Sequence, residues 1–375
     1  MQTVAAPQTT IESLSAGSIA RRFTRYLLTL TIPVSALLFT LTGPHTWEWA
    51  LALWMILPLH VVLDAIGKPG RDQPVEGEPS WLYTGLLVFL AAFHLVNVVL
   101  ICRMFATVDL ATVDGIADLL VAVQLVGTSS GLSGIVVAHE LMHRPHKGLQ
   151  LLSRVVMALV LYEHFFTEHV RGHHVRVGTR DDPATARFRE RFGPFMLRTI
   201  PAQFRSAWEI EIKRNGLEGK GLWHPAQLRN RVVQGILGEL LLVAVTGALF
   251  GGVAVVIFVA QALWAIRLLE AVNYFEHWGL SRAGRKVRPV DSWDTESSFT
   301  LYGMVGLSRH ADHHAYASRP YQSLRHFDVS PKYPGGYISM VVMVTNNNRK
   351  FMRLATQELE ARKLGPFAEA PSEAA

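Results

Sequence analysis

The chain has 375 residues, of which 50% are hydrophobic, and carries a formal charge of +6 at pH 7. Because its mean hydropathy is positive, it is too apolar for an ordinary soluble domain of this size, and we expect a membrane protein. No nucleic-acid-binding motif is present. The single cysteine, Cys102, excludes a disulfide within the chain, a CxxC redox centre and a cysteine-ligated iron centre. Electrons for any redox reaction must therefore come from another protein.

Six apolar segments predict an all-α integral membrane protein with six transmembrane helices. These segments cover about residues 26–41, 47–66, 81–101, 116–138, 232–250 and 253–270. The pair Gly251 and Gly252 predicts a tight turn between the last two.

The remaining chain divides simply. We expect a flexible N-terminus over residues 1–20, a single membrane domain over 21–365 and a flexible tail over 366–375. Residues 149–166 are apolar but include Glu163 and His164, so this stretch is expected to lie at the membrane surface or re-enter the bilayer instead of crossing it.

The basic residues predict the orientation of these spans. With six spans, the arginines and lysines lie almost entirely on one side: Arg21, Arg22, Arg25, Lys68, Arg71, those within 144–231 and those after Arg282. Cytoplasmic loops carry this excess of positive charge. We therefore expect a multi-pass protein of the inner (cytoplasmic) membrane, with both termini and its histidine-rich segments in the cytoplasm.

Histidines recur at metal-ligand spacing in three clusters and one further motif. The clusters are HELMH from His139, EHVRGHH from Glu168 and HADHH from His310, and the further motif is NYFEHWG with His277. Helix residues four apart share a face, so we expect His169 and His173 to reach one metal while adjacent His174 points about 100° away. In the third cluster, His310 would pair with either His313 or His314.

Together these motifs predict a binuclear metal site. Its expected ligands are His139, His143, His169, His173, His174, His277, His310, His313 and His314. Four acidic neighbours are candidates to orient the ligands from outside: Glu140, Glu168, Glu276 and Asp312. HELMH also resembles the HExxH motif of zinc proteases, but such a site needs one further ligand and this chain offers many histidines instead. The isolated histidines are expected to be structural or solvated: His45, His60, His94, His146, His164, His224 and His326.

The four motifs, in this order after these spans, resemble the membrane alkane 1-monooxygenases and their relatives the xylene monooxygenases. These belong to the wider group of integral-membrane desaturases and hydroxylases, from which NYFEHWGL separates them. The resemblance covers residues 20–350. It implies a six-helix fold with a cytoplasmic di-iron site held by the nine histidines, O2 as co-substrate, and rubredoxin or ferredoxin with an NAD(P)H-dependent reductase as electron donor.

One segment departs from that family's pattern. Where alkane hydroxylases usually carry a histidine-containing segment, this chain has DSWDTESS from Asp291 to Ser298, which leaves the substrate open. A medium-chain n-alkane is the first expectation. The alternatives are an aromatic methyl group as in xylene, and a fatty acid that is hydroxylated, desaturated or decarboxylated to a terminal alkene.

Three further interpretations concern the substrate channel, a docking surface for the electron donor and the class of protein. Trp54 and Phe89 are candidates to line an apolar substrate channel between the spans, although large apolar residues on spans commonly face lipid. A basic face for an acidic donor protein would use Arg171, Arg176 and Arg180, although arginines are also usual in cytoplasmic loops. A membrane metal transporter is the non-enzyme alternative, but no ladder of histidines crosses the predicted spans.

Overall fold

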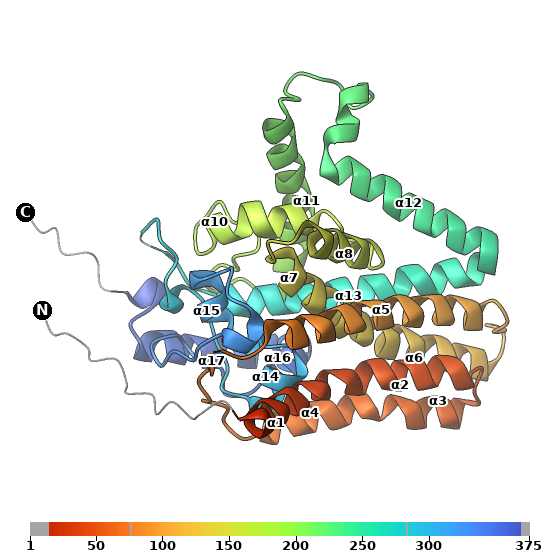
Figure 1. Ribbon diagram of the computed structural model, residues 1–375, viewed down its shortest axis with the longest axis horizontal. Helices are drawn as coiled ribbons and strands as arrows, with labels where there is room; N and C mark the ends of the chain where they lie inside the picture. Colours follow the sequence, from red (N-terminus) through yellow and green to blue (C-terminus); the bar gives the residue numbers. More distant parts are fainter. Residues whose placement is uncertain (1–14, 76, 283, 369–375) are drawn as a thin grey trace, which may run out of the picture.

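The computed structural model describes residues 15–75, 77–282 and 284–368 (Figure 1). Over these ranges the chain folds into helices and loops, and its only extended pairings are isolated bridges between Pro69 and Ser297 and between Asp294 and Lys332. This confirms the all-α prediction.

Six helical segments are long and apolar enough to cross a membrane. The first joins α1 (Ala16–Tyr26), η1 (Leu27–Leu30) and α2 (Thr31–Thr42), and the second joins α3 (Trp47–Trp54) and α4 (Ile56–Ile66). The third is α5 (Ser80–Phe105), and the fourth joins α6 (Val113–Ser129), η2 (Ser130–Val136) and α7 (Val137–Met142). The fifth and sixth are α12 (Arg231–Phe250) and α13 (Gly252–His277). The six predicted spans are therefore confirmed.

The boundaries differ from the expected ones in places that matter for the histidines. The fourth segment continues to Met142 and the sixth to His277, so both carry histidines on the helix itself. At 26 residues, α13 is about 39 Å long, which is longer than the hydrocarbon thickness of a bilayer requires. The turn before it uses Gly251 at φ 85°, as the glycine pair predicted.

The two ends of the chain also differ from expectation. Helix α1 starts at Ala16, so residues 16–20, expected to be flexible, are helical from that point. At the other end, the first two residues of the expected flexible tail 366–375 lie in the 3₁₀ helix η8 (Gly365–Phe367). Residues 1–14 and 369–375 lie outside the described residues.

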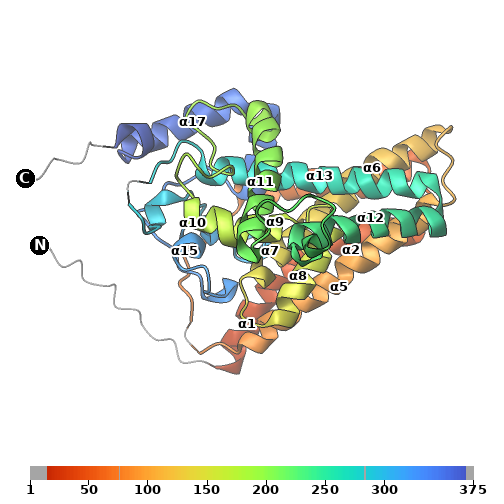
Figure 2. The ribbon, with the colours of Figure 1, turned by 90° about the horizontal axis from the view of Figure 1, so that it is seen from above.

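Most of the remaining helices gather at one end of the molecule (Figures 1 and 2). After α7 come α8 (Lys147–Ala158), α9 (Phe165–Thr167), η3 (Glu168–His173), α10 (His174–Arg176), α11 (Phe192–Asn215) and η4 (Pro225–Arg229). After α13 come η5 (Pro289–Asp291), α14 (Ser298–Gly303), η6 (Leu307–Arg309), α15 (His310–Ala315), η7 (Tyr321–Ser323), α16 (Tyr337–Asn346), α17 (Asn348–Ala361) and η8 (Gly365–Phe367). The stretch 149–166 covers most of α8, the loop after it and the start of α9; α8 packs on α7, and the stretch is not among the spanning helices, as predicted.

Two apolar cores hold this arrangement. One packs the spans on each other and includes Phe39, Phe105 and Phe258. The other joins the spans to the histidine-bearing end and includes Leu141, Phe275 and Trp278, each within two residues of a histidine in sequence. Because the second core encloses the residues beside the ligands, packing fixes the backbone from which the imidazoles project.

Candidate metal centre

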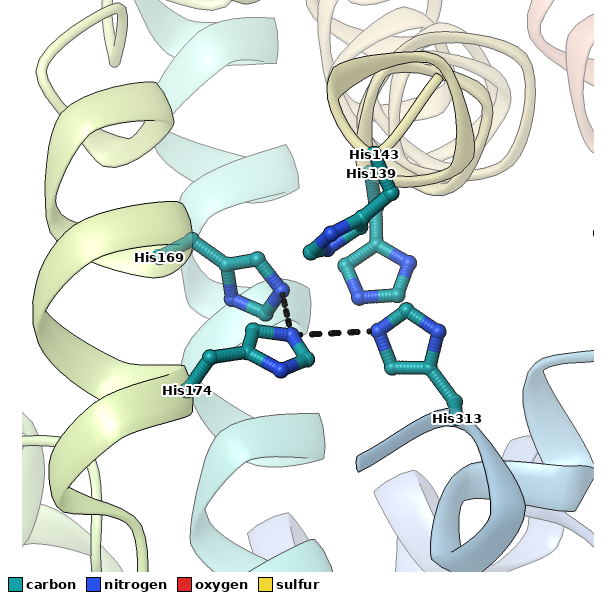
Figure 3. A group of neighbouring side chains, drawn as sticks. All are labelled: His139, His143, His169, His174 and His313. Atoms are coloured by element: carbon teal, nitrogen blue, oxygen red, sulfur yellow. Dashed lines mark hydrogen bonds between the residues drawn. The ribbon is translucent and has the colours of Figure 1, made fainter. Parts of the chain in front are cut away.

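Five imidazoles from three separate parts of the chain converge on one point (Figure 3). Each offers one nitrogen, and these nitrogens all lie within 4.8 Å of one another. We call these residues the first ligand group: His139 and His143 from the end of α7, His169 and His174 from η3 and α10, and His313 from α15.

The pairing within EHVRGHH differs from the sequence prediction. His169 shares the first ligand group with His174, not with His173, and the Nε2 atoms of His169 and His174 lie 3.0 Å apart. The reason is that η3 is a π-helix, in which the His174 N–H donates to the carbonyl of His169, five residues earlier. A wider turn rotates each later side chain relative to an α-helix, so α-helical spacing named the wrong partner. The sequence predicted that His173 and His174 serve different metals, with His173 beside His169. In the structure they do lie in different groups, but it is His174 that lies beside His169.

The other four histidines lie beside the first ligand group. His173, His277 and His314 form one possible metal-binding set, and Glu276, His277 and His310 form another that overlaps it. We call these five residues the second ligand group. The alternatives left open in the third cluster are resolved, because the His310 ring centroid is 4.4 Å from that of His314 and 5.9 Å from that of His313.

Glu276 is closer to the site than expected. Its Oε2 lies 3.2 Å from Nε2 of His310, whose Nε2 is also 3.3 Å from Nε2 of His277. A carboxylate at that position can itself bind a metal, so Glu276 is a candidate ligand and not only an outer support. The sequence placed it directly before His277, but adjacency alone could not distinguish the two roles.

The donor set fits a pair of metal ions. Nε2 of His174 faces Nε2 of His169 at 3.0 Å and Nε2 of His313 at 3.2 Å (Figure 3). Other ring nitrogens are buried without a hydrogen-bond partner, including Nε2 of His139 and of His143. Buried polar atoms normally have a hydrogen-bond partner. Ring nitrogens whose lone pairs converge, with no proton between them to share, therefore indicate a site for a cation. Nine imidazoles and one carboxylate in two groups can hold two ions.

The protonation state of the imidazoles suits the same role. Burial, followed by the neighbouring imidazoles, holds the pKa of His169, His174 and His313 well below the usual value for histidine. Burial likewise lowers the pKa of His143 to about 3. These rings are therefore neutral at pH 7, which is the form that binds metals.

One supporting residue was missed by the sequence analysis. Asp182 lies in the loop after α10, and its Oδ2 is 2.9 Å from Nδ1 of His173 and accepts a 2.5 Å hydrogen bond from the Thr185 hydroxyl. Although burial raises the pKa of Asp182, the interactions with His173, Thr185 and His277 together outweigh it, and the net pKa lies below the ordinary value. A carboxylate on Nδ1 fixes the ring orientation and directs Nε2 toward the metal position. The sequence contained one indication of this role, the acidic pair Asp181 and Asp182, which lies in the loop directly after the EHVRGHH cluster.

Two of the acidic residues expected to orient histidines bind arginines instead. Glu140 pairs with Arg144 at 2.8 Å and accepts the backbone N–H of Tyr321 at 3.1 Å. Asp312 accepts from Arg319 and Arg325, at 2.5 and 3.1 Å. These arginines, which follow in the chain, give both carboxylates charged partners. Their contacts tie α7 and α15 to the loop that follows α15.

Glu168 likewise bonds to an arginine, Arg176, at 2.6 Å, and Arg176 also donates to the Ser206 hydroxyl at 2.6 Å. Gly172 makes this possible, since a Cβ there would lie 2.5 Å from the Glu168 carboxylate. Burial raises the pKa of Glu168 to about 7, although Ser206 and Arg176 lower it. Of the three arginines considered for a docking face, Arg176 is therefore engaged inside the protein, while Arg171 and Arg180 are exposed.

The segment DSWDTESS backs the second ligand group. The Trp293 N–H donates to the Glu276 carbonyl at 3.0 Å, and its indole N–H donates to the Trp278 carbonyl at 2.9 Å. Asp294 accepts the backbone N–H of Ala311 at 2.8 Å, within the third histidine cluster. This segment therefore joins the end of α13 to α15 and holds their histidines together.

A cavity of about 600 Å³ leads from the membrane-spanning part to both ligand groups. At its inner end it is lined by His139 and His169 of the first group and by Glu276 and His310 of the second. Most of its wall is apolar, with side chains such as Leu57, Leu132, Ile135, Leu269, Val272 and Val341.

The two predicted channel residues have different positions. Trp54 lines this cavity, and its indole N–H donates to Gln124 at 3.2 Å. Phe89 does not line it and is 50% exposed on the outer face of α5, so its assignment to the channel was wrong. The physical reason is that large apolar side chains on a span commonly face lipid.

Comparison with known proteins gives consistent relatives. Residues 116–342 match the family model described as fatty acid desaturase. The chain is 42% identical to alkane 1-monooxygenase 1 of Pseudomonas aeruginosa over 227 residues, which is 58% of each chain. It is 35% identical to alkane 1-monooxygenase 2 of the same organism over 311 residues, covering 80% of this chain and 81% of the relative. Alkane 1-monooxygenase of Acinetobacter baylyi is 33% identical over 318 residues, with 81% and 73% covered.

Proposed function

Because the chain belongs to the fatty acid desaturase family, and within it to the alkane 1-monooxygenases, we propose that it hydroxylates the terminal methyl group of a hydrophobic substrate, in the first instance a medium-chain n-alkane. The observation that carries the proposal is the apolar cavity that ends on both ligand groups. An alkane has no polar group to recognise, so a narrow apolar passage that presents one chain end is the available means of selecting a terminal carbon.

The proposed cofactor is a pair of non-haem iron ions, held by the nine histidines with Glu276 as a further candidate ligand. When bound, the pair would supply the reduction of O2 by two electrons and two protons, with one oxygen atom entering the C–H bond and the other leaving as water. The neutral imidazoles, the dense burial and the unpartnered nitrogens support this assignment.

The chain's own residues have separate tasks in this scheme. The Asp182 carboxylate holds the His173 ring in one orientation. The apolar wall around Leu132 and Val272 excludes water and confines the substrate chain. The cavity would bring the terminal methyl between the two ligand groups, since residues of both line its inner end.

We also propose the cellular setting. The basic residues support a cytoplasmic position for the histidine end of a multi-pass inner-membrane protein whose residues 21–365 act as one domain. The electron donor would be a rubredoxin or ferredoxin with its NAD(P)H-dependent reductase, because the one cysteine cannot form a redox centre in this chain. Exposed Arg171 and Arg180 are candidate contacts for such an acidic partner.

The test is conversion by whole cells that express the chain with a rubredoxin and its reductase. Octane, dodecane, p-xylene and dodecanoic acid are supplied under air, and products are identified by mass spectrometry. We expect 1-alkanols from the alkanes, and no product from His173→Ala. The matched control is His224→Ala, since His224 is exposed and only caps η4. An internal alkene as the main product would identify a desaturase and overturn the proposal.

A further inference from the structure

One cation lines the apolar cavity. Of the arginines and lysines in the part of the chain that the structure describes, only Arg267 belongs to the cavity wall. It lies on α13, within a membrane-spanning segment, and is half-buried. Ionisable residues inside a span are costly and usually have a function or a partner.

Arg267 has no acidic partner among the described residues. Within the described part of the chain, it makes a cation–π contact in which its guanidinium carbon lies over the Trp264 ring, 5.3 Å from the ring centroid. The indole is in turn fixed by its N–H, which donates to Thr128 at 3.1 Å, and Thr128 also lines the cavity. The guanidinium is therefore positioned by a cation–π contact, while its N–H donors have no acceptor among the residues that the structure describes.

The position of Arg267 along the cavity relates it to the ligand groups. It precedes His277 by ten residues on one continuous helix, which corresponds to about 15 Å along the axis. Beyond Arg267 the α13 wall of the cavity is apolar at Leu268, Leu269 and Val272 and becomes polar at Asn273 and Glu276, next to the ligand groups. The cavity thus has Arg267 at one position along α13 and the candidate metal centre near the His277 end of that helix. The space between them can hold an alkyl chain.

We propose that Arg267 binds the carboxylate of a fatty acid whose alkyl chain extends along the cavity, so that its terminal methyl is hydroxylated. This inference rests on the proposed function and deepens it, by adding medium-chain fatty acids to the substrate class. The reaction converts the acid's CH3 group, O2, two electrons and two protons into a CH2OH group and water, with the electrons supplied by the same donor protein. The carboxylate is unchanged, and its charge-assisted hydrogen bonds to the guanidinium fix which chain end reaches the histidines.

A phospholipid phosphate offers the same anionic chemistry, so the test must separate the two sources. The full chain in lipid nanodiscs is equilibrated with radiolabelled dodecanoic acid at a pH where the acid is ionised. The wild-type protein is compared with Arg267→Gln and Arg267→Lys. The matched control is Arg349→Gln, because Arg349 is exposed and does not line the cavity.

We expect Arg267→Gln to weaken binding of the acid about tenfold, the usual effect of losing a hydrogen bond to a charged group. Arg267→Lys should retain part of the affinity, and Arg349→Gln should bind as the wild type does. On the wild-type protein, methyl dodecanoate should compete about tenfold more weakly than the acid. This last comparison needs no variant, so a folding defect cannot imitate it.

Equal competition by the acid and its methyl ester would overturn the proposal. Unchanged acid binding by Arg267→Gln, together with a lower content of co-purified phospholipid phosphate, would assign the cation to a lipid headgroup and overturn it as well. Binding is measured without turnover, so a protein that binds the acid through Arg267 but hydroxylates neither dodecane nor dodecanoic acid would refute the proposed function and leave the carboxylate site standing.

Discussion

The two ligand groups of the candidate metal centre lie side by side but differ in charge. The first consists of five neutral imidazoles with no carboxylate among its members. The second includes Glu276, 3.2 Å from His310, and is supported by Asp182, 2.9 Å from His173. Anionic oxygens stabilise a dication more than neutral nitrogens do in a buried site. Similar histidine motifs have therefore produced two unequal positions, and we expect the second to hold its metal more tightly.

The largest expected effect comes from removing one imidazole from either group. His313→Ala should cost the first position its metal and His314→Ala the second, so each variant should retain about one metal ion per chain of the two expected. Hydroxylation should fall by more than about 100-fold in both, because it needs both positions. Metal content by mass spectrometry and 1-alkanol formation measure the two effects.

His224→Ala, which changes an exposed histidine, controls for general effects and should retain both metals. If His313→Ala and His314→Ala each released both ions, the two groups would bind cooperatively and could not be compared as separate positions.

A smaller effect should follow from Asp182→Asn, which acts on the second group alone. Loss of the carboxylate behind His173 should weaken metal binding at that position by about 10–100-fold and leave the first position unchanged. Asp181→Asn is the matched control, because Asp181 is exposed beside it. Titration with a metal chelator measures both positions, and equal loss from both groups in Asp182→Asn would show that Asp182 supports the loop as a whole.

The limits of sequence reasoning follow from the same residues. The six spans were predictable because apolar length is a local property, and the convergence of the histidines followed from their places at span ends. The division of His169, His173 and His174 between the groups depends on a π-helical turn, which no α-helical pattern indicates. Asp182 was missed because its contact with His173 is made by a loop. Which apolar residues face the cavity depends on how each helix is rotated in the bundle, and so Trp54 and Phe89 could not be distinguished.

The cavity serves both groups, so its width should change the substrate without changing either metal position. Trp54→Ala removes a large side chain from the wall and should raise turnover of longer alkanes relative to octane by about tenfold. Phe89→Ala removes a comparable side chain from the outer face and should leave the ratio as in the wild type. Competition between alkanes of different length gives this ratio directly. Equal shifts in both variants would mean that the lipid-facing surface, and not the cavity, controls access.

The smallest effect concerns pH and the metal-free protein. Burial lowers the pKa of His143 to about 3, so the unfolded chain, with a histidine pKa of about 6.5, binds more protons than the folded chain. Stability from this group is complete above about pH 6.5 and is lost as the pH falls, by about 1 kcal/mol at pH 5.5.

His143→Asn, which keeps a polar group of similar size, should therefore show a shallower fall of the unfolding temperature between pH 7 and 5.5. In the second group Asp182 contacts His173, while burial holds the pKa of His314 well below its ordinary value. His314→Asn should accordingly also flatten the curve, and an unchanged curve in that variant would show that the buried imidazoles of the second group do not contribute to the pH dependence.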